Sequence, residues 1–209
     1  MKIGIYGSGN IGATVARHFV KAGHQVGICN SRGPASLAGL VKSLGPNACA
    51  MSPEETAKFG DLIFLAVPWR SSEAWPRPQW VKGKIVVDAM NPYSAEGEIM
   101  DIGERNSSEE VAQRLPGARL VKAFNTMFYQ TLAKEARVSE KDRLVLFVAG
   151  NDAEAKGVVS RLIEQIGFAA VDTGSLHEGG KRQQPNSPIY NKPMTVSQAR
   201  EALHGTTAA

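Results

Sequence analysis

Apolar residues follow two periods along this chain, one typical of buried strands and the other of amphipathic helices. The strand-like segments are short and nearly continuous in apolar residues, the pattern of parallel strands that are buried on both faces. A short further strand is expected around Cys49. The other predicted strands lie at residues 2–6, 25–30, 61–68, 84–89, 119–124, 144–149 and 168–172.

Between these segments, apolar residues recur every three or four positions, as they do along one face of a helix. Ile11, Val15 and Phe19 form such a stripe after the first strand, and residues 153–166 repeat the pattern before the last one. Strands that alternate with helices at this rhythm predict an α/β fold with a doubly wound, mostly parallel sheet.

Two helix starts carry the spacing of a capping box, in which a Ser or Thr is followed three residues later by Glu or Gln. Ser52 and Glu55 have this spacing, with Pro53 at the first helical position, where proline is favoured. Ser107 and Glu110 have it again. We therefore expect helices to begin at both places.

The chain changes character after the last predicted strand. Residues 176–195 contain two adjacent glycines and three prolines, which predict an irregular segment, and a short helix is expected at 196–203. We expect residues 1–175 to form the main domain. Residues 176–209 would be a C-terminal loop and short helix that belong to the same domain or form a dimer contact.

Composition limits the classes of function. The 209 residues are 43% apolar, enough for a core, and the 24 Lys and Arg are scattered among 20 acidic residues. No apolar run approaches the length of a membrane-spanning helix, which is about 18 to 20 residues. The four histidines are dispersed, and Cys29 and Cys49 do not form a CxxC pair. We expect a cytoplasmic protein with no metal, no membrane partner and no nucleic-acid partner.

A glycine-rich loop follows the first strand directly and opens the first helix. Gly7, Gly9 and Gly12 have the G-x-G-x-x-G spacing, which allows a tight turn, close approach of a pyrophosphate and close packing of the helix. Because a helix N-terminus favours an anion, this context predicts a Rossmann-type NAD(P)-binding fold. An ordinary tight turn is the alternative.

The end of the second strand distinguishes the two dinucleotides. Rossmann proteins that bind NAD place an acidic residue there, whereas this chain has Asn30, Ser31 and Arg32. Arg32 can pair with a 2′-phosphate through two hydrogen bonds, and Ser31 can donate to it, so the sequence favours NADP(H). Alternatively, Arg32 is a solvated loop residue and Asn30 caps the next helix.

Three more strand ends should meet this loop, because ligands of doubly wound sheets lie at the carboxyl ends of the strands. Small and amide-bearing residues there can flank a nicotinamide, while an indole or thioether offers an apolar surface to a flat acceptor. Proline and asparagine also turn chains for purely structural reasons. The segments are Val67-Pro68-Trp69, Ala89-Met90-Asn91-Pro92-Tyr93 and Asn125-Thr126-Met127.

Lys122 and Asp88 are the strand-associated charges that suggest acid/base chemistry. Each lies inside its predicted strand, where a hydrogen-bonded structural role is the alternative. We therefore assign no catalytic residue from the sequence.

Together these motifs resemble the deazaflavin-dependent NADP oxidoreductase family over residues 1–175, and also the reductase domain of the transmembrane metalloreductases. The resemblance implies that the ends of the fourth to sixth strands hold the nicotinamide against the acceptor ring. The segment from Leu176 onward departs from the family pattern. By position, the implied cofactor contacts are Ser8, Asn10, Ile11, Ser31, Arg32, Pro68, Ala89 and Asn91, and the acceptor contacts are Trp69, Asn125, Thr126 and Met127.

The leading hypothesis is therefore hydride transfer between NADP(H) and a small-molecule acceptor, a deazaflavin or flavin. A reductase of small carbonyl or imine substrates is a second hypothesis, and a non-catalytic module that senses NADP(H) is a third. A homodimer that completes the pocket is compatible with each of them.

Overall fold

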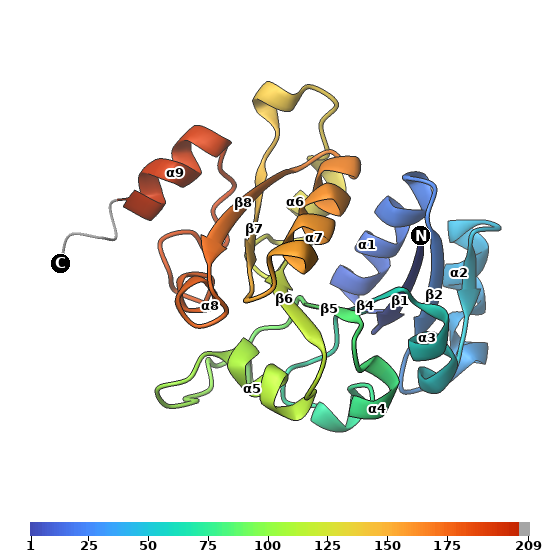
Figure 1. Cartoon of the computed structure of the whole chain (residues 1–209). Helices are drawn as coiled ribbons and strands as arrows, with labels where there is room; N and C mark the ends of the chain where they lie inside the picture. The colour runs from blue at the N-terminus through green and yellow to red at the C-terminus, as the bar shows by residue number, and fades with distance from the viewer. Residues whose placement is uncertain (205–209) are drawn as a thin grey trace.

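An eight-stranded sheet forms the centre of the computed structural model, which describes residues 1–204 (Figure 1). The strand order is β3-β2-β1-β4-β5-β6-β7-β8, and neighbouring strands are parallel except for β6 and β7. The predicted doubly wound, mostly parallel sheet is thus confirmed. The strands are β1 Lys2–Tyr6, β2 Gln25–Cys29, β3 Ala48–Ala50, β4 Leu62–Leu65, β5 Ile85–Asp88, β6 Arg119–Ala123, β7 Val145–Ala149 and β8 Ala169–Gly174.

Helices connect the strands and cover both faces of the sheet (Figure 1). Short 3-10 turns lie at Pro34–Leu37, Ser72–Ala74 and Glu140–Asp142. The α-helices are α1 Asn10–Lys21, α2 Ala38–Leu44, α3 Pro53–Phe59, α4 Pro78–Val81, α5 Ser107–Arg114, α6 Tyr129–Lys134, α7 Ala153–Gln165, α8 Glu178–Arg182 and α9 Val196–His204.

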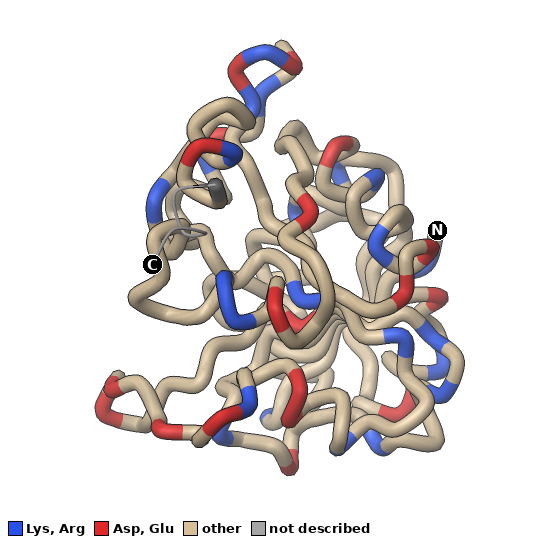
Figure 2. Tube along the Cα trace, turned by 60° about the vertical axis from the view of Figure 1, so that its left-hand side comes forward, with Lys and Arg blue, Asp and Glu red and all other residues tan. Residues whose placement is uncertain are grey.

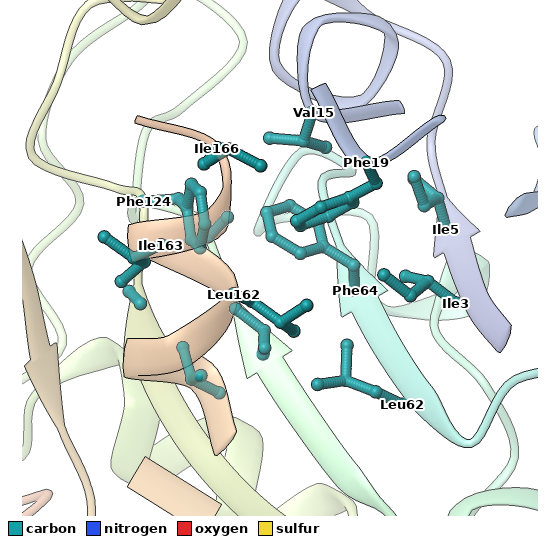
Figure 3. Packing of buried hydrophobic residues seen from close by; sticks show 14 of the residues in the cluster. Ile3, Ile5, Val15, Phe19, Leu62, Phe64, Phe124, Leu162, Ile163 and Ile166 are labelled. Carbon is teal, nitrogen blue, oxygen red and sulfur yellow. The ribbon is translucent and has the colours of Figure 1, made fainter. Parts of the chain in front are cut away.

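Buried side chains of the described residues form three clusters: two large ones on opposite faces of the sheet and a smaller one beside α9. On the face covered by α1 and α7, Phe64 lies 5.1 Å from Phe124 and 6.0 Å from Phe19 between ring centroids, in edge-to-face contacts (Figure 3). The opposite face buries Ala57 of α3 and Val111 of α5. Because both faces are covered, the strands are apolar on both sides, which explains their continuous apolar runs.

One predicted capping box is confirmed and the other is displaced by one residue. Ser52 and Glu55 exchange the two expected hydrogen bonds at the start of α3. At α5 the N-cap is Asn106 and its partner is Glu109, so the prediction of Ser107 and Glu110 was wrong. Asparagine caps as well as serine does, and a tertiary contact decides here, because Asn106 Nδ2 also donates to the carbonyls of residues 176 and 177.

The C-terminal segment is more ordered than its composition predicts. The segment expected to be irregular contains α8, whereas the predicted short helix is present as α9. Ile189 is buried, and the backbone N–H of Asn191 donates to the carbonyl of Thr126, 2.9 Å away. Ala199 of α9 packs with Val145 of β7. This segment therefore returns to the end of β6, where several predicted site residues lie.

Candidate functional site

The carboxyl ends of β2, β1, β4, β5 and β6 lie next to one another, because these strands are consecutive in the sheet and parallel. The chain reverses its strand order between β1 and β4, the position at which doubly wound sheets bind ligands. The structure therefore brings the glycine loop to the same edge as the three predicted strand ends.

Each glycine of the loop has a different environment. A Cβ atom on Gly7, whose φ is +105°, would lie 2.2 Å from the carbonyl oxygen of Ala66, and one on Gly12 would lie 2.0 Å from that of Gly7. A Cβ on Gly9 would meet no atom within 4 Å. Gly7 and Gly12 are thus required for packing, whereas Gly9 faces open space that a ligand can approach.

Gly9 is also the N-cap of α1, and no side chain caps this helix. The first turn contains no acidic residue, and its first backbone N–H groups have no acceptor within the helix. Such a helix start attracts an anion through its free donors and its dipole. Beside it, Ser8 accepts a hydrogen bond from Asn30 at 3.1 Å, Asn10 is exposed and Ile11 is half-buried.

The loop after β2 is organised by Asn30. Its Nδ2 donates to Ser8 and Ser36, and its Oδ1 accepts from the backbone N–H of Arg32 at 3.0 Å. Ser31 and Arg32 are exposed, and no group within residues 1–204 forms a hydrogen bond or an ion pair with the Arg32 guanidinium. Asn30 therefore joins the two loops, and Arg32 presents a cation next to the glycine loop.

A pocket of about 230 Å³ opens at the ends of β5 and β6. Six predicted residues line it, and five further residues were missed by the sequence analysis. Thr126 is buried behind them, where its carbonyl holds Asn191. The predicted lining residues are Asn10, Ile11, Ala89, Asn91, Asn125 and Met127, and the additional ones are Phe124, Phe128, Tyr129, Tyr190 and Asn191.

Comparison with known proteins agrees with this geometry. The family described as NADP oxidoreductase coenzyme F420-dependent matches residues 2–92, from β1 to the bend after β5. F420-dependent NADP reductase of Methanocaldococcus jannaschii is 29% identical over 149 residues, which cover 66% of this chain and 66% of that protein. Residues 2–92 of the chain therefore match the NADP oxidoreductase family.

Two further relatives cover more of the chain. Metalloreductase STEAP3 of Rattus norvegicus is 35% identical over 178 residues, or 84% of this chain. That match covers 34% of the metalloreductase, so the chain spans about a third of its length. The crystal structure of the hypothetical protein SMa0349 from Sinorhizobium meliloti has a TM-score of 0.82 and 35% identity, covering 93% of this chain and 95% of that one.

Trp69 is not among the residues that line this pocket. Its indole N–H donates to the carbonyl of Ser107 at 3.1 Å, and its ring meets Trp75 edge-on in the second core cluster. Val67 and Pro68 precede it, and Val67 is half-buried beside Gly7. The aromatic surface of the pocket comes instead from residues 128 and 129.

Phe128 and Tyr129 pack against each other at the mouth of the pocket, with ring centroids 4.8 Å apart and ring planes tilted by 57°. Phe128 is 49% exposed, which is unusual for a large apolar side chain. The sequence contained a signal for this pair, since two adjacent aromatic residues directly follow Met127. The predicted strand-end segment stopped at Met127, two residues short of including the pair.

Behind the pocket, a buried polar network fixes the bend after β5. Asp88 Oδ1 accepts from the N–H of Met90 at 2.9 Å, and Lys122 Nζ donates to the carbonyl of Met90 at 2.5 Å. Ser108 donates to Asp88 Oδ2 at 2.6 Å. Burial lowers the pKa of Lys122, while the Asp88 carboxylate acts in the opposite direction. The network thus positions Ala89 and Asn91.

A larger hollow of about 330 Å³ lies between the last turns of α1 and α7. Arg137 and Arg143 contribute to its wall, but their guanidinium groups donate to the carbonyls of Asp142 and Arg137. Because its lining includes none of the strand-end residues, we place the functional site at the smaller pocket.

Residues 1–204 show no sign of a metal site or a membrane-spanning helix. That part of the chain holds no group of three or more His, Cys, Asp or Glu arranged to bind a metal. None of its helices combines the length and apolar character needed to cross a bilayer. Lysines and arginines are interspersed with acidic residues over the molecule (Figure 2).

Proposed function

We propose that this chain binds NADP(H) along the carboxyl edge of the sheet and transfers hydride between it and a deazaflavin or flavin. One arrangement carries the proposal: the start of α1, which no side chain caps, faces open space at Gly9, and the exposed Arg32, whose guanidinium has no partner within residues 1–204, belongs to the loop that Asn30 joins to Ser8. An elongated ligand with a pyrophosphate and a further phosphate matches these two features.

The residues present fit NADP(H) part by part. The backbone N–H groups of α1 would bind the pyrophosphate, and Arg32 with Ser31 would bind the 2′-phosphate. Ala89 and Asn91 would flank the nicotinamide, because they line the pocket together with Asn10 and Ile11 of the glycine motif. When bound, NADPH supplies the hydride, so the chain's own contribution is to position two rings and exclude water.

The acceptor side supports a flat aromatic partner. Phe128 and Tyr129 present two aromatic rings at the pocket mouth, and Met127, which is 5% exposed, adds an apolar surface. Offset stacking on such rings is favourable for any planar heterocycle. Both ring systems named in the proposal have this shape.

A reductase of small carbonyl or imine substrates is a second candidate, and one observation favours it. Such a reaction needs a placed proton donor, and the hydroxyl of Tyr190 lies in the pocket wall, 3.1 Å from the hydroxyl of Tyr93. A flavin-type ring would have more contact area with Phe128 and Tyr129 than a small carbonyl or imine compound would. We therefore rank the flavin-type acceptor first.

The test is NADPH oxidation by the purified protein with a deazaflavin, FMN, FAD, a panel of small carbonyl and imine compounds, or no acceptor. We expect turnover with a deazaflavin or flavin and slower oxidation of NADH. Turnover with carbonyl or imine compounds alone would favour the second candidate. Tight NADPH binding without any turnover would contradict both and indicate a sensing module.

A further inference from the structure

The C-terminal segment supplies a hydroxyl group to the wall of the pocket. Tyr190 is half-buried and lines the cavity together with Ala89, Asn91 and Met127. Its side chain therefore faces the space where, under the proposed function, the nicotinamide meets the acceptor.

Several contacts hold Tyr190 in this position. Ile189 is 2% exposed, and Asn191 adopts a left-handed φ of 52° while its N–H donates to the carbonyl of Thr126. Asparagine tolerates this conformation better than most residues do. Upstream, the carbonyl of Gln183 accepts from Asn125 Nδ2 at 2.8 Å. The segment is thus fixed to the end of β6 on both sides of Tyr190.

The hydrogen bonds of Tyr190 give its hydroxyl a direction. Its oxygen accepts from the hydroxyl of Tyr93 at 3.1 Å and from Nδ2 of Asn91 at 3.2 Å. Asn91 is itself fixed, because the same Nδ2 donates to the carbonyl of Asn125 and its Oδ1 accepts from Asn125 Nδ2. With two donors on its oxygen, Tyr190 directs its own hydrogen away from both.

We infer that Tyr190 is a catalytic hydrogen-bond donor to the acceptor ring, so that the C-terminal segment is part of the acceptor site. This inference rests on the proposed function. During transfer, the C4–H bond of NADPH breaks and a new bond to hydrogen forms on the acceptor, which gains two electrons while NADPH becomes NADP⁺. The resulting negative charge spreads over the conjugated nitrogen and carbonyl oxygen of the acceptor, which later take a proton from water.

A neutral hydroxyl aimed at that developing charge lowers the barrier, as donors of an oxyanion hole do. Burial raises the pKa of Tyr190, so the hydroxyl keeps its proton at neutral pH and remains a donor. Tyr93 and Asn91 act as positioning residues, since they set the direction of this bond.

The test is a single-turnover measurement of NADPH oxidation at saturating acceptor in the parent protein and in Tyr190→Phe, which keeps the ring. We expect the rate constant to fall about 100-fold, while the Kd for NADPH stays within about twofold. With NADPH deuterated at C4, the variant should show a full primary isotope effect, because hydride transfer is the slowed step. Tyr93→Phe retains the Tyr190 hydroxyl and should lower the rate less.

Each outcome has a distinct meaning. A parent protein that binds NADPH but reduces no flavin-type acceptor would refute the proposed function, and this inference with it. In an active parent, a Tyr190→Phe rate within threefold of normal would overturn only the role of Tyr190. A loss confined to NADPH affinity would also overturn it, since Tyr190 would then bind the cofactor instead.

Discussion

Lys122 and Asp88 form an ion pair in which Nζ lies 3.2 Å from Oδ2, and neither side chain has exposed surface. The pair joins the ends of β6 and β5 directly behind the pocket, and each partner also holds a backbone group of Met90. Removing two charges from water costs free energy, which their mutual attraction offsets only while both partners are present. The intact pair therefore fixes the ends of β5 and β6, whereas loss of one partner would leave an unpaired buried charge.

Lys122→Met should destabilise the fold by about 3 to 5 kcal/mol, because it leaves the Asp88 carboxylate buried without a counter-charge. Urea denaturation would measure the change in the free energy of unfolding. The control is Lys58→Met, which removes an exposed i,i+4 pair with Glu54 and should cost less than about 0.5 kcal/mol. Equal losses in the two variants would contradict the structural role of the buried pair.

Gly9→Ala should weaken NADPH binding about tenfold or more while changing the thermal midpoint little. The added methyl group meets open space in the protein but fills the place proposed for the pyrophosphate. Gly12→Ala is the matched comparison, and it should cost about 1 to 3 kcal/mol of stability because its Cβ overlaps the Gly7 carbonyl. Unchanged NADPH binding in Gly9→Ala would rule out the glycine loop as the pyrophosphate site.

Arg32→Ala should weaken NADP(H) binding about 10- to 100-fold and leave NAD(H) binding nearly unchanged, since only NADP(H) carries the 2′-phosphate. Calorimetric titration of both dinucleotides would measure the two affinities. Arg161→Ala, an exposed change on α7, serves as the control for loss of one positive charge. Equal effects on NADP and NAD would refute the assignment of Arg32.

Asp152→Asn tests the pH dependence of stability. Two hydrogen bonds from Arg119, helped by the N–H of Ala155, lower the pKa of Asp152 to about 2. Because this pKa lies below the unfolded value, the contribution is complete above about pH 4 and is lost as the pH falls toward 2. Asparagine keeps the N-cap but removes the charge.

The parent protein should therefore exceed this variant in urea midpoint at pH 7, and the difference should vanish near pH 2. High salt should shrink the difference at pH 7, since both side chains of the pair are partly exposed. If the difference in urea midpoint grew as the pH fell, the pKa of Asp152 would be higher in the folded protein than in the unfolded chain, which would contradict this prediction.

The sequence predicted much of the sheet and of the loop because both signals are local. Parallel strands covered on both faces must be apolar throughout, so residues 61–68 and 84–89 marked β4 and β5 without knowledge of their neighbours. The spacing of Gly7, Gly9 and Gly12 can be seen within six consecutive residues. The antiparallel direction of β7 left no local signal, because a strand's side-chain pattern is the same in either orientation.

The sequence by itself determined the fold class, the glycine loop and the cation at Arg32, since each depends on periodicity or on spacing within a few residues. Only the tertiary structure decided that Trp69 packs against Trp75, that Phe128 stands at the pocket mouth and that Tyr190 enters from a segment 99 positions after Asn91. These three facts depend on where distant segments meet. Such contacts are set by packing of the whole chain and leave no periodic pattern along it.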